Sequence, residues 1–96
     1  MTSKQRAYLR GCANSIDAIF QIGKSGVSDV LLEQLDKALE ARELIKVTVL
    51  ESAPGSAKEL ANLVAKGNNS CVIQTVGNKI TLFRQKKKNS KFELPK

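Results

Sequence analysis

The stretch that most constrains the fold is Gln21–Ser28, where a strand-like apolar run ends in a basic loop bracketed by glycines and a helix begins. Gly23 and Gly26 can both take positive φ angles, and they let a ligand approach the backbone where a Cβ would block it. Ser28 can serve as the N-cap of the helix, and Asp29 suits its first turn. We therefore expect this loop to abut the positive end of a helix dipole.

A loop of this kind can hold a phosphate backbone, because free backbone N–H groups and the helix dipole attract anions, as in the GXXG loops of KH modules. Lys24 adds a positive charge and Ser25 adds a hydroxyl group. Two glycines three residues apart are also ordinary turn chemistry, so the motif alone leaves both interpretations open. A Walker A nucleotide loop would need glycine at position 18, where the chain has Ala18, which makes a nucleotide-binding enzyme the weaker hypothesis.

Apolar periodicity along the chain predicts three helices and four strands in the order α-β-α-β-α-β-β. The helix between the first two strands favours parallel pairing with a right-handed crossover, and Gly77-Asn78 favours a type II′ hairpin between the last two. The predicted fold is therefore α/β (α+β), a two-layer sandwich with a four-stranded mixed sheet packed by helices. The expected elements are a helix capped by Thr2 and Gln5, a mostly buried strand from Asp17 to Ile22, a helix from Ser28 to about Ala41, a strand from Leu44 to Leu50, a helix from Ser56 to a C-cap at Gly67, and strands Cys71–Val76 and Lys79–Arg84.

The 96-residue chain carries a formal charge of +7, which is unevenly distributed and suggests a polyanionic partner. Four basic residues and one acidic residue lie in 1–26, five basic and seven acidic in 27–67, and seven basic and one acidic in 68–96. From residue 86 the chain is lysine-rich with too little apolar content to fold. We therefore expect one domain over residues 1–85 and a flexible basic tail over 86–96.

Several residue types argue against catalysis, cofactors and membranes. The absence of histidine removes the commonest general base and metal ligand. Cys12 and Cys71 lie in apolar patterns without paired-ligand spacing, so we expect buried, reduced thiols and no metal or cofactor. No apolar run is long enough to span a bilayer and no signal-peptide pattern is visible, so we expect a cytoplasmic, non-enzymatic protein.

Three motifs in nearly constant spacing resemble the CRM domain (chloroplast RNA splicing and ribosome maturation), in its single-domain bacterial form: Gln21–Ser28, Glu43–Val47 and Gln74–Arg84. The resemblance covers almost the whole chain, and Ser3–Arg10 is similar to the family's opening helix. It implies an RNA-binding domain similar in fold to the C-terminal domain of translation initiation factor 3. Bacterial single-domain members of this family associate with precursors of the large ribosomal subunit.

The resemblance also implies roles for particular residues. Gly23, Lys24, Ser25 and Gly26 match the family's GXXG loop, although Gly or Asn commonly stands where this chain has Ser25. Arg84 matches the basic residue that closes the last strand. Lys46, in the second motif, is interpreted as a structural lysine that extends past apolar surface.

We therefore expect a monomeric RNA-binding protein that acts mainly through electrostatics on ribosomal RNA, with no small-molecule substrate. Arg6 and Arg10, one helical turn apart, are either an ordinary solvated surface or an extra phosphate contact. An alternative is a protein-docking adaptor that uses the acidic edge of the second helix, formed by Asp29, Glu33, Asp36 and Glu40. The predicted RNA-binding residues are Gly23, Lys24, Ser25, Gly26, Arg84, Lys86, Lys87, Lys88, Lys4, Arg6 and Arg10.

Overall fold

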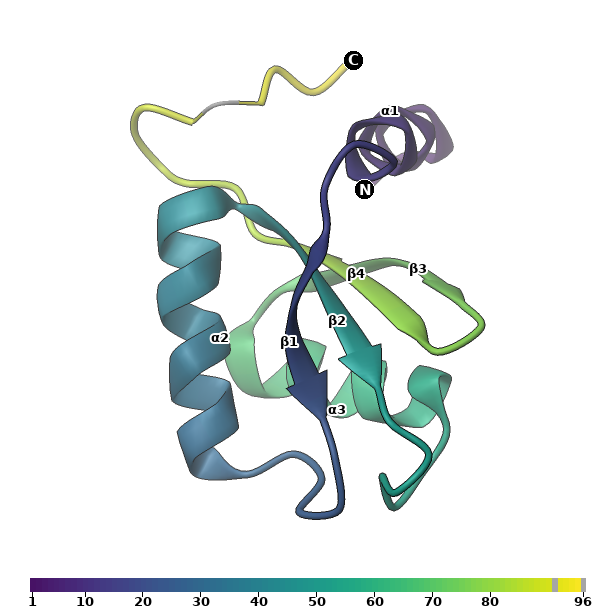
Figure 1. The fold of residues 1–96 in the computed structure, drawn as a ribbon. Coiled ribbons are helices and arrows are strands. Elements are labelled where there is room, and N and C mark those ends of the chain that lie inside the picture. Colours follow the sequence, from purple (N-terminus) through teal and green to yellow (C-terminus); the bar gives the residue numbers. More distant parts are fainter. Residues whose placement is uncertain (91, 96) are drawn as a thin grey trace.

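Three helices and four strands alternate along the chain in the predicted order, in a computed structural model that describes residues 1–90 and 92–95 (Figure 1). Bounds differ from the predicted ones by a few residues at most. The elements are α1 (Ser3–Ala13), β1 (Ala18–Ile22), α2 (Asp29–Arg42), β2 (Leu44–Val49), α3 (Ala57–Asn68), β3 (Cys71–Val76) and β4 (Lys79–Phe83).

The four strands form one mixed sheet in the order β1-β2-β4-β3. β1 pairs with β2 in parallel, as predicted, and β4 pairs antiparallel with both β2 and β3. Because β1 and β2 run in the same direction, the loops that follow them leave the sheet at the same end (Figure 1). Gly77 opens the β3–β4 turn with a φ of 59°, which confirms the predicted role of this glycine.

Side chains cap the start of each helix, as their spacing predicts. In α1 the Thr2 hydroxyl accepts a hydrogen bond from the Gln5 backbone N–H at 3.1 Å, and the Gln5 side chain accepts one from the Thr2 N–H at 3.0 Å. Ser56 and Glu59 form the same capping box in α3. The Ser28 hydroxyl accepts from the N–H three residues later in α2, at 3.1 Å. Each cap contributes about 1 kcal/mol to stability.

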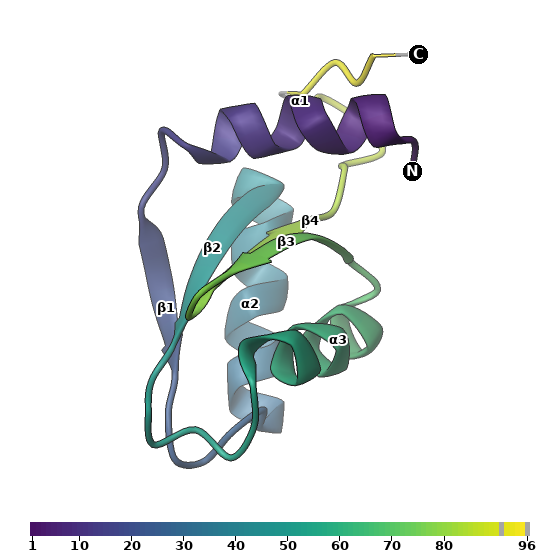
Figure 2. The ribbon, with the colours of Figure 1, turned by 90° about the vertical axis from the view of Figure 1, so that its right-hand side faces the viewer.

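The main core lies between one face of the sheet and helices α2 and α3. From Ile45 onward β2 alternates, because Ile45, Val47 and Val49 are buried while Lys46 and Thr48 are only half-buried. Leu44, before them, is also buried, but it packs in the other core cluster. Figure 2 shows α2 and α3 on this side, with the other face of the sheet covered only at one end, by α1. The buried residues of the main core are Ile22, Leu35, Ala38, Leu39, Ile45, Val47, Val49, Leu60, Ala61, Val64, Ile80 and Leu82.

A second, smaller core lies under α1 on the opposite face. Leu9 and Ala13 of α1 pack against Leu44, Ile73 and Phe83, which lie at the covered end of the sheet. The C-terminal segment contributes to this core. The ring of Phe92 packs edge-on against Phe83, with 5.5 Å between the ring centroids, and Leu94 packs nearby.

Glu43 ties the start of the C-terminal segment to the end of α2. This residue is the C-cap of α2, has a φ of 67° and is fully buried. Its carboxylate accepts hydrogen bonds from the Lys86 backbone N–H at 3.1 Å and from the Ser90 hydroxyl. The flexibility expected of residues 86–96 stays a prediction, and Lys91 and Lys96 lie outside the described residues.

Two local expectations about the elements are wrong. β1 is an edge strand rather than a mostly buried one, because Ile19 is 38% exposed and Gln21 is exposed. α3 does not end with a cap at Gly67, since it continues to Asn68 and Asn69 takes the left-handed conformation, with φ 55°. Gly67 instead permits close helix packing: a Cβ there would lie 3.0 Å from a methyl group of Leu32 in α2.

The expected burial of both thiols is also only partly correct. Cys12 is half-buried, as part of the edge of the smaller core, and is a free thiol. Cys71 is a free thiol too, but it is exposed at the start of the edge strand β3. An apolar neighbourhood in sequence therefore does not bury a side chain that lies at the margin of a sheet.

The main core predicts a large difference between two leucines. Leu82→Ala removes a fully buried side chain between the sheet and its helices, so we expect a loss of about 2–5 kcal/mol in the free energy of unfolding. Leu63→Ala is the matched control, because Leu63 is 56% exposed on α3, and its loss should stay within about 0.5 kcal/mol. Urea denaturation measures both, and equal losses would contradict this description of the core.

Candidate nucleic-acid interface

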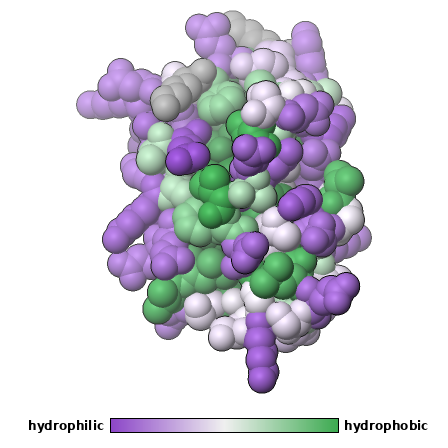
Figure 3. Space-filling model, viewed as in Figure 1, coloured by the Kyte–Doolittle hydropathy of each residue, from purple (hydrophilic) through white to green (hydrophobic). Residues whose placement is uncertain are grey.

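The GXXG loop, Gly23–Gly26, is a tight turn between β1 and α2. The Gly26 N–H donates a hydrogen bond to the Gly23 carbonyl oxygen at 2.9 Å, which closes the turn. Lys24 and Ser25, at its tip, are both exposed. Figure 3 has the same viewpoint as Figure 1. It shows a long hydrophilic side chain projecting from the end of the molecule where this loop lies.

The two glycines have different roles, although we expected the same positive φ at both. Gly26 has a φ of 66° and packs against Pro54, so closely that a Cβ would lie 2.8 Å from the ring. Gly23 does not have a positive φ, and a Cβ there would make only ordinary contacts of 3.6 Å with Leu50 and 3.7 Å with Ser52. Gly26 is therefore required by the fold, whereas the fold leaves Gly23 free to vary.

The β2–α3 loop supports the GXXG loop from behind. Leu50 and Ser52 lie beside Gly23, close enough to contact a Cβ there, Pro54 packs against Gly26, and Ser56 then caps α3. The first turns of α2 and α3 consequently follow two loops that touch each other, so two helix N-termini lie at this end of the molecule (Figure 1). Their dipoles favour an anion there.

Arg84 and the lysine run form a second cationic cluster beside the C-terminal end of α2. A hollow of about 650 Å³ is lined by Arg84 and Lys86–Lys88 together with Glu40, Asn69 and Gln85. Within this cluster Arg84 is largely neutralised, since its guanidinium pairs with Asp36 and with Glu40, the latter at 3.2 Å. It also donates to the Asn68 carbonyl oxygen at 2.8 Å, so it joins α2, α3 and β4.

The three basic residues of α1 that we predicted to bind RNA differ in their exposure to solvent. Lys4 and Arg10 are exposed, whereas Arg6 is half-buried and its guanidinium donates to the carbonyl oxygen of Val72 in β3. Tyr8, on the same helix, is 38% exposed. A side-chain hydrogen bond with Cys12 is the main cause that raises the pKa of the Tyr8 hydroxyl above 10.0, so this residue remains neutral at physiological pH.

The predicted residues do not converge on one site. The GXXG loop lies at one end of the molecule, whereas α1 and the C-terminal segment lie at the other (Figures 1 and 2). Along α2, between these two ends, the exposed face is acidic, but most of its carboxylates are engaged: Glu33 pairs with Lys37 at 3.8 Å, and Asp36 and Glu40 pair with Arg84.

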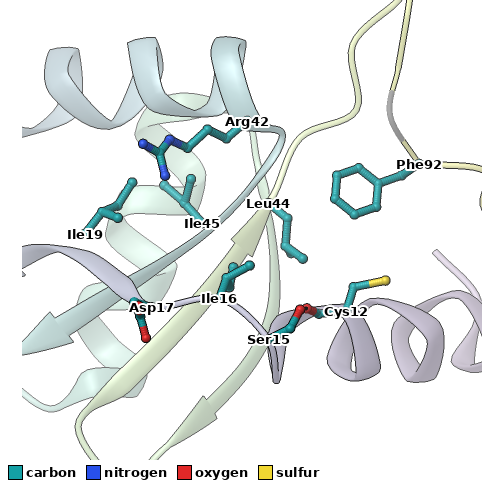
Figure 4. Close-up of a pocket in the computed structure, with 9 residues that line it drawn as sticks. All are labelled: Cys12, Ser15, Ile16, Asp17, Ile19, Arg42, Leu44, Ile45 and Phe92. Carbon is teal, nitrogen blue, oxygen red and sulfur yellow. The ribbon is translucent and has the colours of Figure 1, made fainter.

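Another hollow, of about 540 Å³, lies between the end of α1, the start of β2 and Phe92 (Figure 4). Its walls are mainly apolar, with Asp17 and Arg42 as the charged side chains among them. It contains none of the predicted RNA-binding residues. In the described part of the chain, no group of three or more His, Cys, Asp or Glu side chains is placed to hold a metal ion, and no helix is long and apolar enough to cross a bilayer.

The comparison with known families gives the class of the protein. Residues 1–84 match the model of the CRS1 / YhbY (CRM) domain, and the chain belongs to this family. It is similar to YqeI of Bacillus subtilis, named a probable RNA-binding protein, with 44% identity over 99% of both chains. It is also similar to an RNA-binding protein of Haemophilus influenzae, with 26% identity over 100% of this chain and 96% of the other.

A solved structure supports the same assignment. The solution structure of a hypothetical protein of Staphylococcus aureus, whose description refers to RNA binding, has a TM-score of 0.84 and 44% identity over 99% of both chains. The predicted fold is thereby confirmed. Neither the family description nor these names refers to a catalytic activity, in agreement with the expectation of a non-enzymatic protein.

The different roles of the two glycines can be tested on stability. Gly26→Ala forces a Cβ into a left-handed conformation against Pro54, so we expect it to lower the free energy of unfolding by about 1–2 kcal/mol or more. Gly23→Ala adds the same methyl group where only ordinary contacts arise, and it should change stability by less than about 0.5 kcal/mol. Urea denaturation compares the two, and an equal loss at Gly23 would show that both glycines are required by the fold.

Proposed function

We propose that this protein binds RNA through the GXXG loop and that its target is ribosomal RNA in a precursor of the large ribosomal subunit. The observation that carries the proposal is the exposed Lys24-Ser25 tip, on a loop whose two glycines lie beside Leu50, Ser52 and Pro54 of the β2–α3 loop. The names of its relatives support RNA as the partner. The ribosomal target rests on the resemblance to single-domain CRM proteins.

The loop binds phosphate by charge and by preorganisation. Lys24 supplies a cation, Ser25 a donor, and the two helix N-termini a favourable potential. Because the loop is already closed by the Gly26–Gly23 hydrogen bond, little conformational entropy is lost when RNA binds. Few aromatic side chains are available for base stacking, so backbone contacts dominate and sequence readout is modest.

The contribution of the other basic residues to RNA binding depends on whether their charges are already paired within the chain. Lys86, Lys87 and Lys88 line an open hollow and add long-range attraction. Arg84, held by two carboxylates, mainly positions the end of β4. The alternative function of a protein-docking adaptor depends on the acidic edge of α2, where three of the four carboxylates form ion pairs within the chain and all four residues are exposed.

A charge reversal in the loop tests the proposal directly. Lys24→Glu should weaken the affinity for a large-subunit ribosomal RNA fragment by about tenfold or more, because it places a negative charge against the phosphate backbone. Affinity is measured over a salt series, with circular dichroism as the check on folding. Lys24 is exposed at the loop tip, so the fold should be unchanged.

Lys66→Glu is the matched control for this experiment. Lys66 is exposed in the last turn of α3 and lies in neither cationic cluster. The control changes net charge by the same amount, so non-specific attraction falls equally in both variants. If Lys66→Glu weakened binding as much as Lys24→Glu, the loop would have no particular role and the proposal would fail.

The lysine run predicts a different kind of effect. Changing Lys86, Lys87 and Lys88 together to Gln should lower the slope of log affinity against log salt by about 2, since each lost phosphate contact removes about 0.7–0.9. Substitution is a cleaner test than truncation after Gln85, because truncation also removes the Phe92 contact with the smaller core. An unchanged slope would exclude these lysines from the interface.

A further inference from the structure

On the sheet face opposite α2 and α3, the residues beyond those that pack under α1 are mostly polar. Their exposure rises along the central strands, from buried Thr81 and half-buried Lys46 to exposed Lys79. β2 and β4 are the central strands, and their paired residues share a face: Thr48 lies opposite Lys79, and Lys46 lies opposite Thr81. The smaller core ends at Leu44 and Phe83, which form the next paired row. In the following row Thr81 is still buried and Lys46 is half-buried, whereas in the row after that Lys79 is exposed.

The paired rows continue onto the edge strands, where most of the side chains are also polar. Gln21 of β1 pairs with Thr48, and Gln74 of β3 pairs with Thr81. Val76, beside Lys79, is the exception and is 61% exposed. We call this surface the open sheet face. Its exposed or half-buried side chains are Gln21, Lys46, Thr48, Gln74, Val76 and Lys79, whereas Thr81, on the same face, is buried.

The charge of the open sheet face is entirely positive in the described structure. Lys79 is exposed and its ammonium group donates to the Thr48 hydroxyl at 2.8 Å, which holds the charge above the central strands. Lys46 is half-buried. Neither lysine belongs to an ion pair among the described residues, in contrast to Lys37 and Arg84 on the α2 side.

This face is continuous with the GXXG loop. Gln21 is two residues before Gly23, and Thr48 is followed by Val49 and then by Leu50, which lies beside Gly23. At its other end the face meets α1, where Arg6 reaches over to the Val72 carbonyl group. The open sheet face therefore connects the GXXG loop, with Lys24, to the basic residues of α1. On the other side of the molecule, the acidic edge of α2 lies between these two regions.

Resting on the proposed function, we infer that the RNA held by the GXXG loop continues across the open sheet face towards α1, with Lys79 and Lys46 contacting its phosphate backbone. The positive charge of the open sheet face matches a polyanion, and the central strands of this face offer no apolar surface to a protein partner. This assigns a binding role to Lys46, which the sequence suggested was structural.

Neutralising the two lysines tests the inference. We expect Lys46→Gln with Lys79→Gln to weaken binding of a large-subunit ribosomal RNA fragment by about tenfold near physiological salt, and to lower the salt slope by about 1.4. The matched control is Lys37→Gln with Lys66→Gln, which removes the same charge from exposed positions on α2 and α3. The control should stay within about twofold of wild type in affinity. Circular dichroism checks that both variants fold.

A photocrosslinker gives a second readout that leaves both lysines in place. p-Benzoylphenylalanine in place of Val76 should crosslink to the bound RNA, whereas the same group in place of Leu63, which is 56% exposed on α3, should not. Crosslinks at both positions or at neither would overturn the inference.

The outcomes separate the inference from the function on which it rests. If Lys24→Glu abolishes binding while the Lys46 and Lys79 variant behaves like its control, the loop binds RNA and the path across the sheet is wrong. If this variant keeps the affinity of its control for RNA, the open sheet face would serve a partner of another class. If Lys24→Glu has no effect, the proposed function itself fails.

Discussion

Parallel pairing of β1 with β2 is the constraint on which the rest of the structure depends. In this register Ile22 lies opposite Val49, so the two strands end together and their following loops must lie side by side. The contact between Gly26 and Pro54 is a direct consequence. Because a helix begins after each loop, the same pairing brings two helix N-termini to one end of the molecule. The candidate anion site is thus a product of sheet topology as much as of the glycine motif.

Ion pairing, more than the number of cations, determines which charges are available to a ligand. Arg84 closes β4 in a motif typical of the family, yet Asp36, Glu40 and a backbone carbonyl group occupy its guanidinium. That arrangement stabilises the junction of α2, α3 and β4 and removes a charge from the surface. Lys24, Lys46 and Lys79 have no such partner among the described residues. A charge count along the chain cannot distinguish these two groups.

Local signals explain how much of the fold the sequence could predict. The caps at Thr2, Ser28 and Ser56 and the turn at Gly77 depend on residues within three positions of each other, and all four are confirmed. Gly67 was misinterpreted because its neighbour is Leu32, 35 residues earlier, across a helix–helix contact.

The wrong expectations about the site and the sheet have the same non-local origin. The single role expected for the two loop glycines failed because Pro54, in another loop, decides which of them the fold requires. The exposure of Ile19 and Cys71 follows from the order of the strands, which no short stretch of sequence encodes. The row formed by Leu44 and Phe83 is apolar and covered, and in the next row Thr81 is still buried while Lys46 is half-buried. The row after that, with Thr48 and Lys79, is polar and can remain in water without a hydrophobic penalty. Burial on this face therefore ends gradually, one row beyond the last apolar pair, and the part of the face that reaches water carries Lys79.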